Sequence, residues 1–268
     1  MVKVANTVNE AVAAESMDAI DARIKHTFNV LSKVAKGVIN GHIKAAIVSG
    51  APGCGKTYTL EQALSTAARE ERIRYESVKG SMSGIGLYRA LYECSNEGDV
   101  LVIDDCDSIF GDLDALNILK AALDTGKTRR VHWNKESRTL KDEDIPRSFE
   151  FKGAVVFITN VDFAKEIEKG SKMAPHYDAL LSRSLYLDLG IHSKREVLVR
   201  ISQVVYSEAF LRDNEINKES AKEMMTWLTA HLARVRVLSI RTIIQLVDLV
   251  KTDGEWQDMA TALVLKRA

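Results

Sequence analysis

Residues 50–57, with the sequence GAPGCGKT, constrain the fold of this chain more than any other segment. A short apolar run of β-strand type, residues 45–48, comes directly before them, and apolar residues at helical spacing follow from Thr57 onward. Glycines at this spacing let consecutive backbone N–H groups converge on one anion, and the N-terminus of the following helix adds its positive dipole end. The sequence therefore predicts a strand, a phosphate-binding loop and a helix, in that order.

The end of this loop also predicts which ligand it holds. A lysine followed by a hydroxyl residue, here Lys56 and Thr57, is the pair that reaches the β- and γ-phosphates of ATP and ligates Mg²⁺. We therefore expect ATP and Mg²⁺ as cofactors, with Thr57 as a metal ligand. The residues expected to contact the nucleotide are Gly50, Ala51, Pro52, Gly53, Cys54, Gly55, Lys56, Thr57 and Tyr58. The alternative is a glycine-rich turn that matches this pattern by chance.

Two carboxylates, Asp104 and Asp105, follow a second apolar run, residues 100–103. Ligands of open α/β sheets bind at the edge where the carboxyl ends of the strands emerge. We expect Asp104 to hold Mg²⁺, directly or through water, and Asp105 to polarise the attacking water as a general base. The alternative is an acidic turn or a helix N-cap. For Asp107, a cap or a supporting role is as well founded as catalysis.

Apolar strands alternate with helices through the first 190 residues. Further strands are expected over residues 72–78, 154–159 and 184–189, and helices over residues 8–36, 57–68, 85–94 and 113–123. This alternation is typical of a parallel sheet covered on both faces. Beyond Gly190 only helices are expected, over residues 193–211, 218–233, 239–251 and 255–266. We therefore predict an α/β domain over residues 1–190, with a parallel five-stranded sheet flanked by helices, and a small all-helical domain over residues 191–268.

The composition is that of an ordinary globular protein. Lys+Arg and Asp+Glu both number 37, so no global basic field indicates nucleic acid, although a local basic surface remains open. Three cysteines without a CxxC pair and six scattered histidines predict reduced thiols and no zinc site. No apolar run approaches the roughly 20 residues that a bilayer span needs, and no signal-type core follows the N-terminus. We expect a soluble, cytoplasmic protein without a membrane partner.

Five segments together resemble the AAA+ ATPases. Residues 50–57 are similar to the Walker A motif of that family, and residues 100–105, VLVIDD, to its Walker B motif. Residues 159–160 resemble sensor 1, residues 178–184 the segment that carries the arginine finger, and residues 239–241 sensor 2. Many P-loop NTPases share the Walker motifs, whereas the last three segments make the resemblance specific. The compact layout is also similar to that of small AAA+ ATPases of bacteriophages.

The resemblance implies roles for three more residues. Asn160 would orient the lytic water, Arg183 would enter the nucleotide site of a neighbouring subunit, and Arg241 would report the γ-phosphate to the helical lid. The alternatives are a turn cap for Asn160 and surface ion pairs for the two arginines. Asp105 departs from the family pattern, because the second Walker B acid is usually Glu. The shorter side chain puts the rate of hydrolysis in doubt more than nucleotide binding.

Three functions remain open on the sequence. The one we favour is an ATPase that couples hydrolysis to remodelling or translocation of nucleic acid or nucleoprotein. The others are a protein-remodelling chaperone and an ATP-gated assembly switch or loader with slow hydrolysis. A P-loop kinase is the remaining alternative among enzymes, but it would need neither Arg183 nor the helical lid. The family usually forms rings or spirals, generally hexameric, so the resemblance implies a homo-oligomer with its substrate in a central pore, and a module without a recognition domain implies an adaptor protein.

Two segments are candidates for contact with such a substrate. Residues 78–84 follow the second strand, where the first pore loop is expected, and Lys79 and Met82 would touch a threaded chain. An ordinary strand–helix connection is the alternative. Residues 125–153 alternate apolar and polar positions at both ends and predict a projecting β-hairpin. Its basic residues and Trp133 suit a phosphate backbone or a base, but acidic residues at the tip favour a solvated hairpin at a subunit interface.

Overall fold

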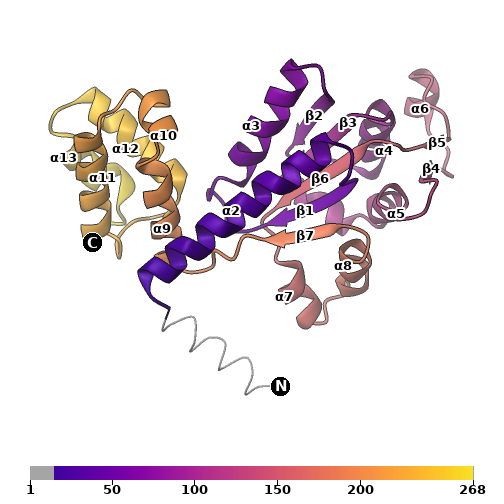
Figure 1. The fold of residues 1–268 in the computed structure, drawn as a ribbon. Coiled ribbons are helices and arrows are strands. Elements are labelled where there is room, and N and C mark those ends of the chain that lie inside the picture. The colour runs from indigo at the N-terminus through magenta and orange to yellow at the C-terminus, as the bar shows by residue number, and fades with distance from the viewer. Residues whose placement is uncertain (1–14, 268) are drawn as a thin grey trace. The chain divides into compact units, whose positions relative to one another are not determined.

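The computed structural model describes residues 15–267 and contains a five-stranded sheet in which every pairing is parallel (Figure 1). The strand order is β2-β3-β6-β1-β7. The strands are β1 (Ala45–Ser49), β2 (Arg74–Lys79), β3 (Asp99–Asp104), β6 (Ala154–Thr159) and β7 (Leu185–Asp188). The predicted parallel five-stranded sheet is therefore confirmed. Residues 8–14 of the predicted N-terminal helix lie outside the described residues, and helix α2 spans Met17–Ile39.

Helices cover both faces of this sheet, as the continuous burial of its central strands requires. Every residue of β1, β3 and β6 is buried. On one face, Leu101, Ile103 and Phe157 pack in one core cluster with residues of α4, α5 and α8. Helix α3 lies on the other face (Figure 1). The bounds are α3 Lys56–Arg69, α4 Gly84–Glu93, η1 Asp107–Gly111, α5 Leu113–Ala122, α7 Phe163–Glu168 and α8 Ala174–Leu181.

The predicted hairpin of residues 125–153 is present as strands β4 (Arg130–His132) and β5 (Ser148–Glu150), which pair antiparallel. The segment between them is not a simple turn, because it contains the short helix α6 (Arg138–Asp142). Trp133 is partly buried, with its ring 5.8 Å from that of Tyr88, so it serves the packing of the hairpin. In this segment Glu136 forms ion pairs with Lys141 and Arg147, which neutralise part of its basic charge.

The C-terminal helices form a second compact unit, which also contains residues 15–27 and 51–55. Its helices are α9 (Lys194–Val205), α10 (Glu208–Asp213), α11 (Lys218–Ala230), α12 (Ile240–Thr252) and α13 (Trp256–Val264). They enclose a separate apolar core that includes Met224, Leu228, Leu246 and Trp256. The predicted all-helical character beyond Gly190 is confirmed. The predicted division of the chain at residue 190 remains a prediction, because residues 15–27 and 51–55 cluster with the C-terminal helices.

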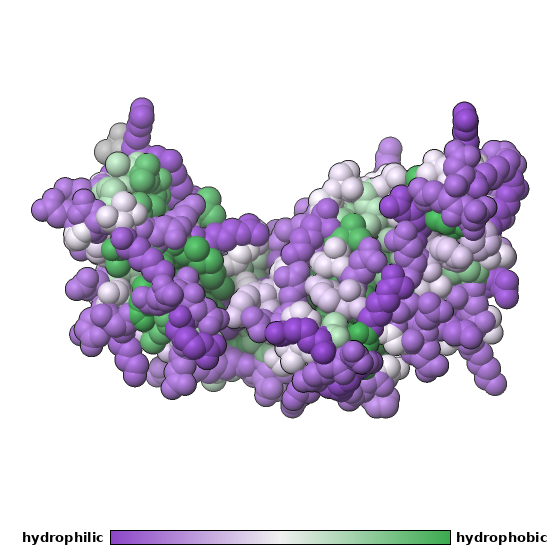
Figure 2. Space-filling view, turned by 90° about the horizontal axis from the view of Figure 1, so that it is seen from above, coloured by the Kyte–Doolittle hydropathy of each residue, from purple (hydrophilic) through white to green (hydrophobic). Residues whose placement is uncertain are grey.

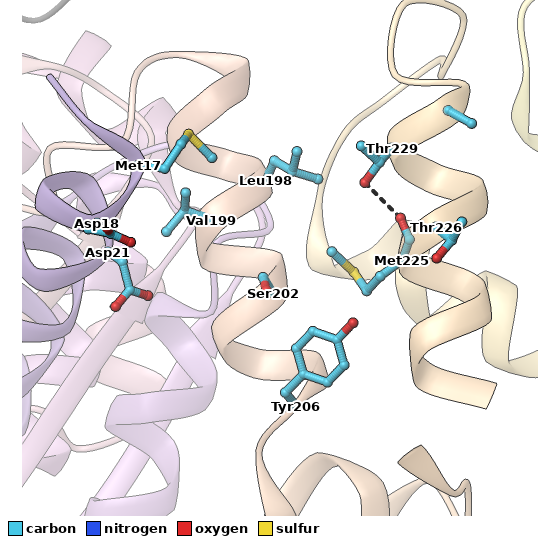
Figure 3. A pocket seen from close by; sticks show the side chains of 11 residues that line it. Met17, Asp18, Asp21, Leu198, Val199, Ser202, Tyr206, Met225, Thr226 and Thr229 are labelled. Atoms are coloured by element: carbon cyan, nitrogen blue, oxygen red, sulfur yellow. Dashed lines mark hydrogen bonds between the residues drawn. The ribbon is translucent and has the colours of Figure 1, made fainter. Parts of the chain in front are cut away.

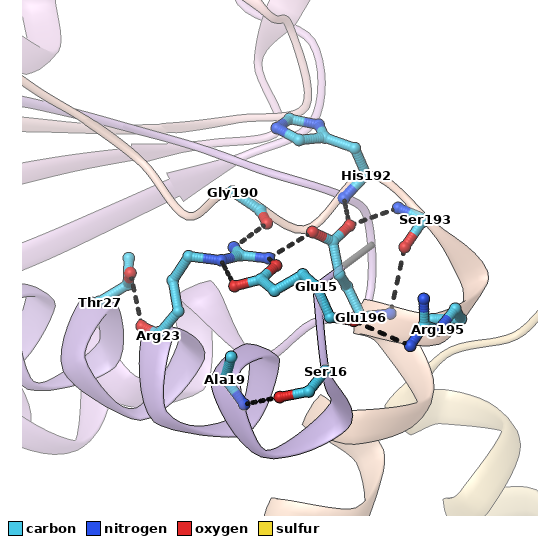
Figure 4. A network of polar contacts seen from close by, with 10 residues as sticks. All are labelled: Glu15, Ser16, Ala19, Arg23, Thr27, Gly190, His192, Ser193, Arg195 and Glu196. Atoms are coloured by element: carbon cyan, nitrogen blue, oxygen red, sulfur yellow. Dashed lines mark hydrogen bonds and ion pairs between the residues drawn. The ribbon is translucent and has the colours of Figure 1, made fainter. Parts of the chain in front are cut away.

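A polar network ties the start of α9 to α2 within the helical unit (Figure 4). Glu196 and the N-cap residue Ser193 form a reciprocal capping box. One Nη atom of Arg23 lies 2.6 Å from Glu196 and 3.0 Å from Glu15, and the other donates to the Gly190 carbonyl. Burial raises the pKa of Glu196, but hydrogen bonds from backbone amides and from Arg23 outweigh it and lower the pKa overall. The anionic form of Glu196 thus binds the start of α9 to Arg23 of α2.

The face of the molecule seen in Figure 2 is mostly hydrophilic, with apolar patches on the helical unit. Apolar residues of this unit that are 43–65% exposed are Met17, Tyr206, Val237, Ile244 and Leu263. Isolated exposed apolar residues are common on protein surfaces and need no special explanation. In the part of the chain that the structure describes, no helix combines the length and the apolar character that crossing a membrane requires.

Candidate functional site

The predicted phosphate loop connects β1 to α3, as its sequence context requires. Gly53 and Gly55 have φ angles of 70° and 93°, in the left-handed region that favours glycine. An added Cβ at Gly53 would lie 2.7 Å from the Cβ atom of Ser239, so a side chain could not be added there without moving the helical unit's own residues. The glycines of this loop therefore serve both its backbone conformation and its close packing.

Lys56 and Asn160 meet at the carboxyl edge of the sheet. The buried Lys56 ammonium donates to the Gly50 carbonyl at 2.7 Å and to the Asn160 side-chain oxygen at 2.8 Å. The Asn160 amide nitrogen in turn donates to Asp105 at 2.8 Å. A single amide thus connects the lysine of the loop to the second acid of the acidic pair. The sequence predicted these three residues at one edge of the sheet, and the structure brings them into direct contact.

Thr57 and Asp104 form the second contact between the loop and the acidic strand. The Thr57 hydroxyl lies 3.1 Å from both carboxylate oxygens of Asp104. A hydroxyl and a carboxylate are hard oxygen donors, which fit the coordination of Mg²⁺ beside nucleotide phosphates and water. Among residues 15–267 no group of three or more His, Cys, Asp or Glu side chains could hold a metal on its own. The metal role of Thr57 and Asp104 therefore depends on a bound nucleotide and stays a prediction.

Asp105 has an unusual backbone conformation for a residue with a side chain. Its φ is 52°, in the left-handed region that Asp tolerates better than most residues, and its amide donates to the Ile158 carbonyl at 3.1 Å. The Asp105 side chain is exposed, whereas that of Asp104 is buried. Asp107 accepts a 2.6 Å hydrogen bond from the Thr159 hydroxyl, which favours the supporting role considered for it. The two neighbouring aspartates thus face different surroundings.

Lys79 also lies at this edge of the sheet, although the sequence predicted it in a loop, residues 78–84, that would contact the substrate. Its ammonium lies 2.7 Å from Glu61 and 3.6 Å from Asp104 instead of extending into a loop. The hydrogen bond to Glu61 is the main cause that raises the pKa of Lys79. Burial raises the pKa of Asp104, while the Thr57 hydroxyl and Lys79 act against that shift. No sequence signal paired Lys79 with Glu61, because the two belong to different elements.

Arg183 lies at the opposite edge of the sheet. It lies two residues before Leu185, the first residue of β7, which is in register with Ala46 of β1, whereas the phosphate loop leaves the carboxyl end of β1. Its guanidinium donates to the Ala179 carbonyl at 2.8 Å and lies 3.9 Å from Asp124. A pocket of 460 Å³ at this edge is lined by Arg183, Asp124 and Lys44 among others. Within one chain, the strands of the sheet separate Arg183 from the other predicted site residues.

Two helix residues of the helical unit donate hydrogen bonds to residues 53 and 54 of the phosphate loop, which belong to the same unit. The Ile240 amide, at the start of α12, donates to the Gly53 carbonyl at 2.9 Å, and the adjacent Arg241 is exposed. From α9, Arg200 donates to the Cys54 carbonyl at 3.1 Å. Burial lowers the pKa of the Arg200 guanidinium to about 10. Arg200 was not predicted as a site residue, since its spacing marks it only as one position of an amphipathic helix.

A separate pocket of 760 Å³ lies within the helical unit, between α2, α9 and α11 (Figure 3). Its lining is mainly apolar and includes Met17, Leu198, Tyr206 and Met225. No residue of the phosphate loop lines it. Tyr58, the last residue of the predicted nucleotide contacts, is 56% exposed on α3.

Known proteins resemble this chain both in sequence and in fold. The model of the viral superfamily 1 RNA helicase core domain matches residues 46–121, which run from β1 into α5. An uncharacterized 36.7 kDa protein from the nrdC-mobD intergenic region of Enterobacteria phage T4 is 45% identical over 248 residues, covering 92% of this chain and 76% of the phage protein.

Two solved structures from Thermotoga maritima share the fold. A RuvB mutant superposes with a TM-score of 0.53 at 14% identity, covering 92% of this chain and 72% of the RuvB chain. Domain III of the replication initiation protein DnaA gives a TM-score of 0.54 at 14% identity, covering 91% of this chain and 92% of that domain. Both agree with the parallel sheet and the C-terminal helices described above. The chain thus belongs to the same family as the 36.7 kDa phage T4 protein and shares the AAA+ fold of these two structures.

Proposed function

We propose that this chain hydrolyses ATP to ADP and phosphate with the side chains gathered at the carboxyl edge of the sheet. The observation that carries the proposal is the Asn160 amide, which links Lys56 to Asp105 through two 2.8 Å hydrogen bonds. Asn160 holds the Asp105 carboxylate at a fixed distance from the loop that binds the phosphates. Asp105 accepts a proton from the attacking water, and Lys56 neutralises phosphate charge as it develops.

The remaining residues of the edge bind and orient the nucleotide. Backbone amides of residues 50–57 hold the phosphates, while Thr57 and Asp104 hold Mg²⁺. The metal supplies charge neutralisation at the phosphate oxygens when it is bound. Arg241, on the exposed first turn of α12, reads the γ-phosphate for the helical unit. Tyr58, at the start of α3, lies beside the bound nucleotide.

The test is the substitution Asp105→Asn, which keeps the size of the side chain and removes its basicity. ATP affinity should stay within about threefold of wild type, while turnover should fall by about 100-fold or more. Asp107→Asn is the matched control, since an Asn oxygen can still accept the hydrogen bond from Thr159. Unchanged turnover in Asp105→Asn would remove Asp105 from the mechanism, and absent ATP binding in the wild type would end the proposal.

We further propose that the chain acts as a homo-oligomer, a hexameric ring or spiral in which Arg183 completes the site of a neighbouring subunit. The position of Arg183 at the opposite edge of the sheet supports this, because one chain cannot bring it to its own phosphate loop. Neither Arg183→Ala nor Lys56→Ala should hydrolyse ATP alone. Mixing the two should restore activity, since some sites then combine an intact loop with an intact arginine. If Arg183→Ala alone hydrolyses ATP normally, the shared site is wrong.

Remodelling or translocation of nucleic acid or nucleoprotein is the activity we favour for such an assembly. The match to a viral RNA helicase core and the likeness to a replication initiation protein support this choice. Single-stranded DNA, double-stranded DNA or RNA should then raise ATP turnover. Stimulation only by an unfolded protein would favour a chaperone, and assembly that follows ATP binding without hydrolysis would favour a switch or loader. We also propose a domain boundary at residue 190, an adaptor protein as a partner of the chain, and a cytoplasmic location.

A further inference from the structure

Lys79 occupies a position beside the predicted metal ligand that the register of the sheet fixes. It is the last residue of β2, and its Cα partner on β3 is Asp104. The Lys79 ammonium lies 3.6 Å from an Asp104 carboxylate oxygen, and its side chain is 52% exposed. Because parallel strands hold these two residues side by side, a cationic group remains within reach of Asp104.

Glu61 offers the same ammonium a second and shorter ion pair, at 2.7 Å. Glu61 and Thr57 are four residues apart on α3 and therefore share one face of that helix. Thr57 contacts Asp104 from this face, and Glu61 contacts Lys79. The four side chains thus form two adjacent pairs, one at the predicted metal ligands and one directly beside them.

We propose that Lys79 competes with the divalent cation for Asp104, and that Glu61 retains the Lys79 ammonium when the cation binds. This inference rests on the proposed function, because it takes Thr57 and Asp104 as the residues that hold Mg²⁺. A cation bound to Asp104 repels a nearby ammonium, whereas an ion pair with Glu61 compensates Lys79 for the loss of Asp104. Lys79 therefore sets how much Mg²⁺ the nucleotide complex requires, and Glu61 lowers that requirement.

The competition between Lys79 and the cation would be measured as the affinity of the ADP complex for Mn²⁺. This affinity would be followed through the electron paramagnetic resonance signal of free Mn²⁺. Lys79→Met should bind Mn²⁺ about fivefold more tightly than wild type, since the competitor is gone. Glu61→Gln should bind it about threefold more weakly, because the ammonium then keeps Asp104 as its partner. The substitution Lys33→Met, at an exposed position of α2, should leave the affinity unchanged.

A second measurement separates competition for the metal from direct phosphate binding by Lys79. The affinity for ADP in the presence of a chelator should be the same in wild type, Lys79→Met and Glu61→Gln. Weaker ADP binding in Lys79→Met under these conditions would show that Lys79 binds phosphate and would overturn the proposal. So would Mn²⁺ affinity that does not increase in Lys79→Met. If wild type binds ADP and Mn²⁺ but the variants do not differ, only this inference fails; if wild type binds no ADP, the proposed function fails with it.

Discussion

The α/β unit and the helical unit fix their polar groups by different means. In the α/β unit, strand register decides which residues meet, as at Lys79 and Asp104 or at the neighbouring ends of β3 and β6. In the helical unit, helix residues bond to backbone groups, as with Ile240 and Arg200 at residues 53 and 54. Strand register survives the loss of one side chain. The contacts in the helical unit, in contrast, depend on a few hydrogen bonds. Substitutions in the first unit should therefore remove chemistry, and those in the second should alter binding and stability.

Among the substitutions that compare the two units, the largest effect is expected for Asn160→Ala in the α/β unit. The change removes the bridge between Lys56 and Asp105 without touching the strands, since Asn160 follows the end of β6 and is exposed. Turnover should fall by about 100-fold, as when one positioned hydrogen-bond donor is lost, while the melting temperature stays that of wild type. Steady-state ATPase assays and thermal unfolding would check both. Asn117→Ala, at an exposed position of α5, should change neither, and a large loss of stability in Asn160→Ala would contradict the contrast between the units.

The sequence predicted that three residues of the α/β unit gather at one edge of the sheet, because each one comes after the end of a recognisable apolar strand. Lys56, Asp105 and Asn160 were expected at one edge, and the edge brings them into contact. Arg200 and the Glu61–Lys79 pair were not predicted. Their contacts depend on which face of a helix packs against which neighbour, and the local spacing of apolar residues leaves that open. The short helix α6 was missed for a related reason, since five residues are too few to show helical periodicity.

A smaller effect is expected for Gly53→Ala in the loop segment that clusters with the helical unit. The new Cβ would meet Ser239 at 2.7 Å, in addition to the cost of a positive φ. The dissociation constant for ADP should rise by about tenfold, as measured by calorimetric titration. Gly98→Ala is the matched control, because Gly98 also has a positive φ of 86° but has nothing within 4 Å of an added Cβ. The control should lose about 1 kcal/mol of stability and keep its affinity; equal affinity in both variants would contradict a packing role for Gly53.

The smallest effect is expected for Glu196→Gln, which tests the polar network at the start of α9. Because the pKa of Glu196 is lowered in the folded state, its contribution to stability is present above the unfolded value near 4.5 and is lost as the pH falls through the folded pKa. At pH 7 the variant should be about 1 kcal/mol less stable than wild type, since amide hydrogen bonds to a carboxylate and the ion pair to Arg23 are weakened. Denaturant unfolding at pH 7 and at pH 3 should show this difference shrinking in acid. Glu223→Gln, at an exposed position of α11, should follow wild type at both pH values. A difference that stays constant with pH would mean that Glu196 stabilises α9 by its shape and not by its charge.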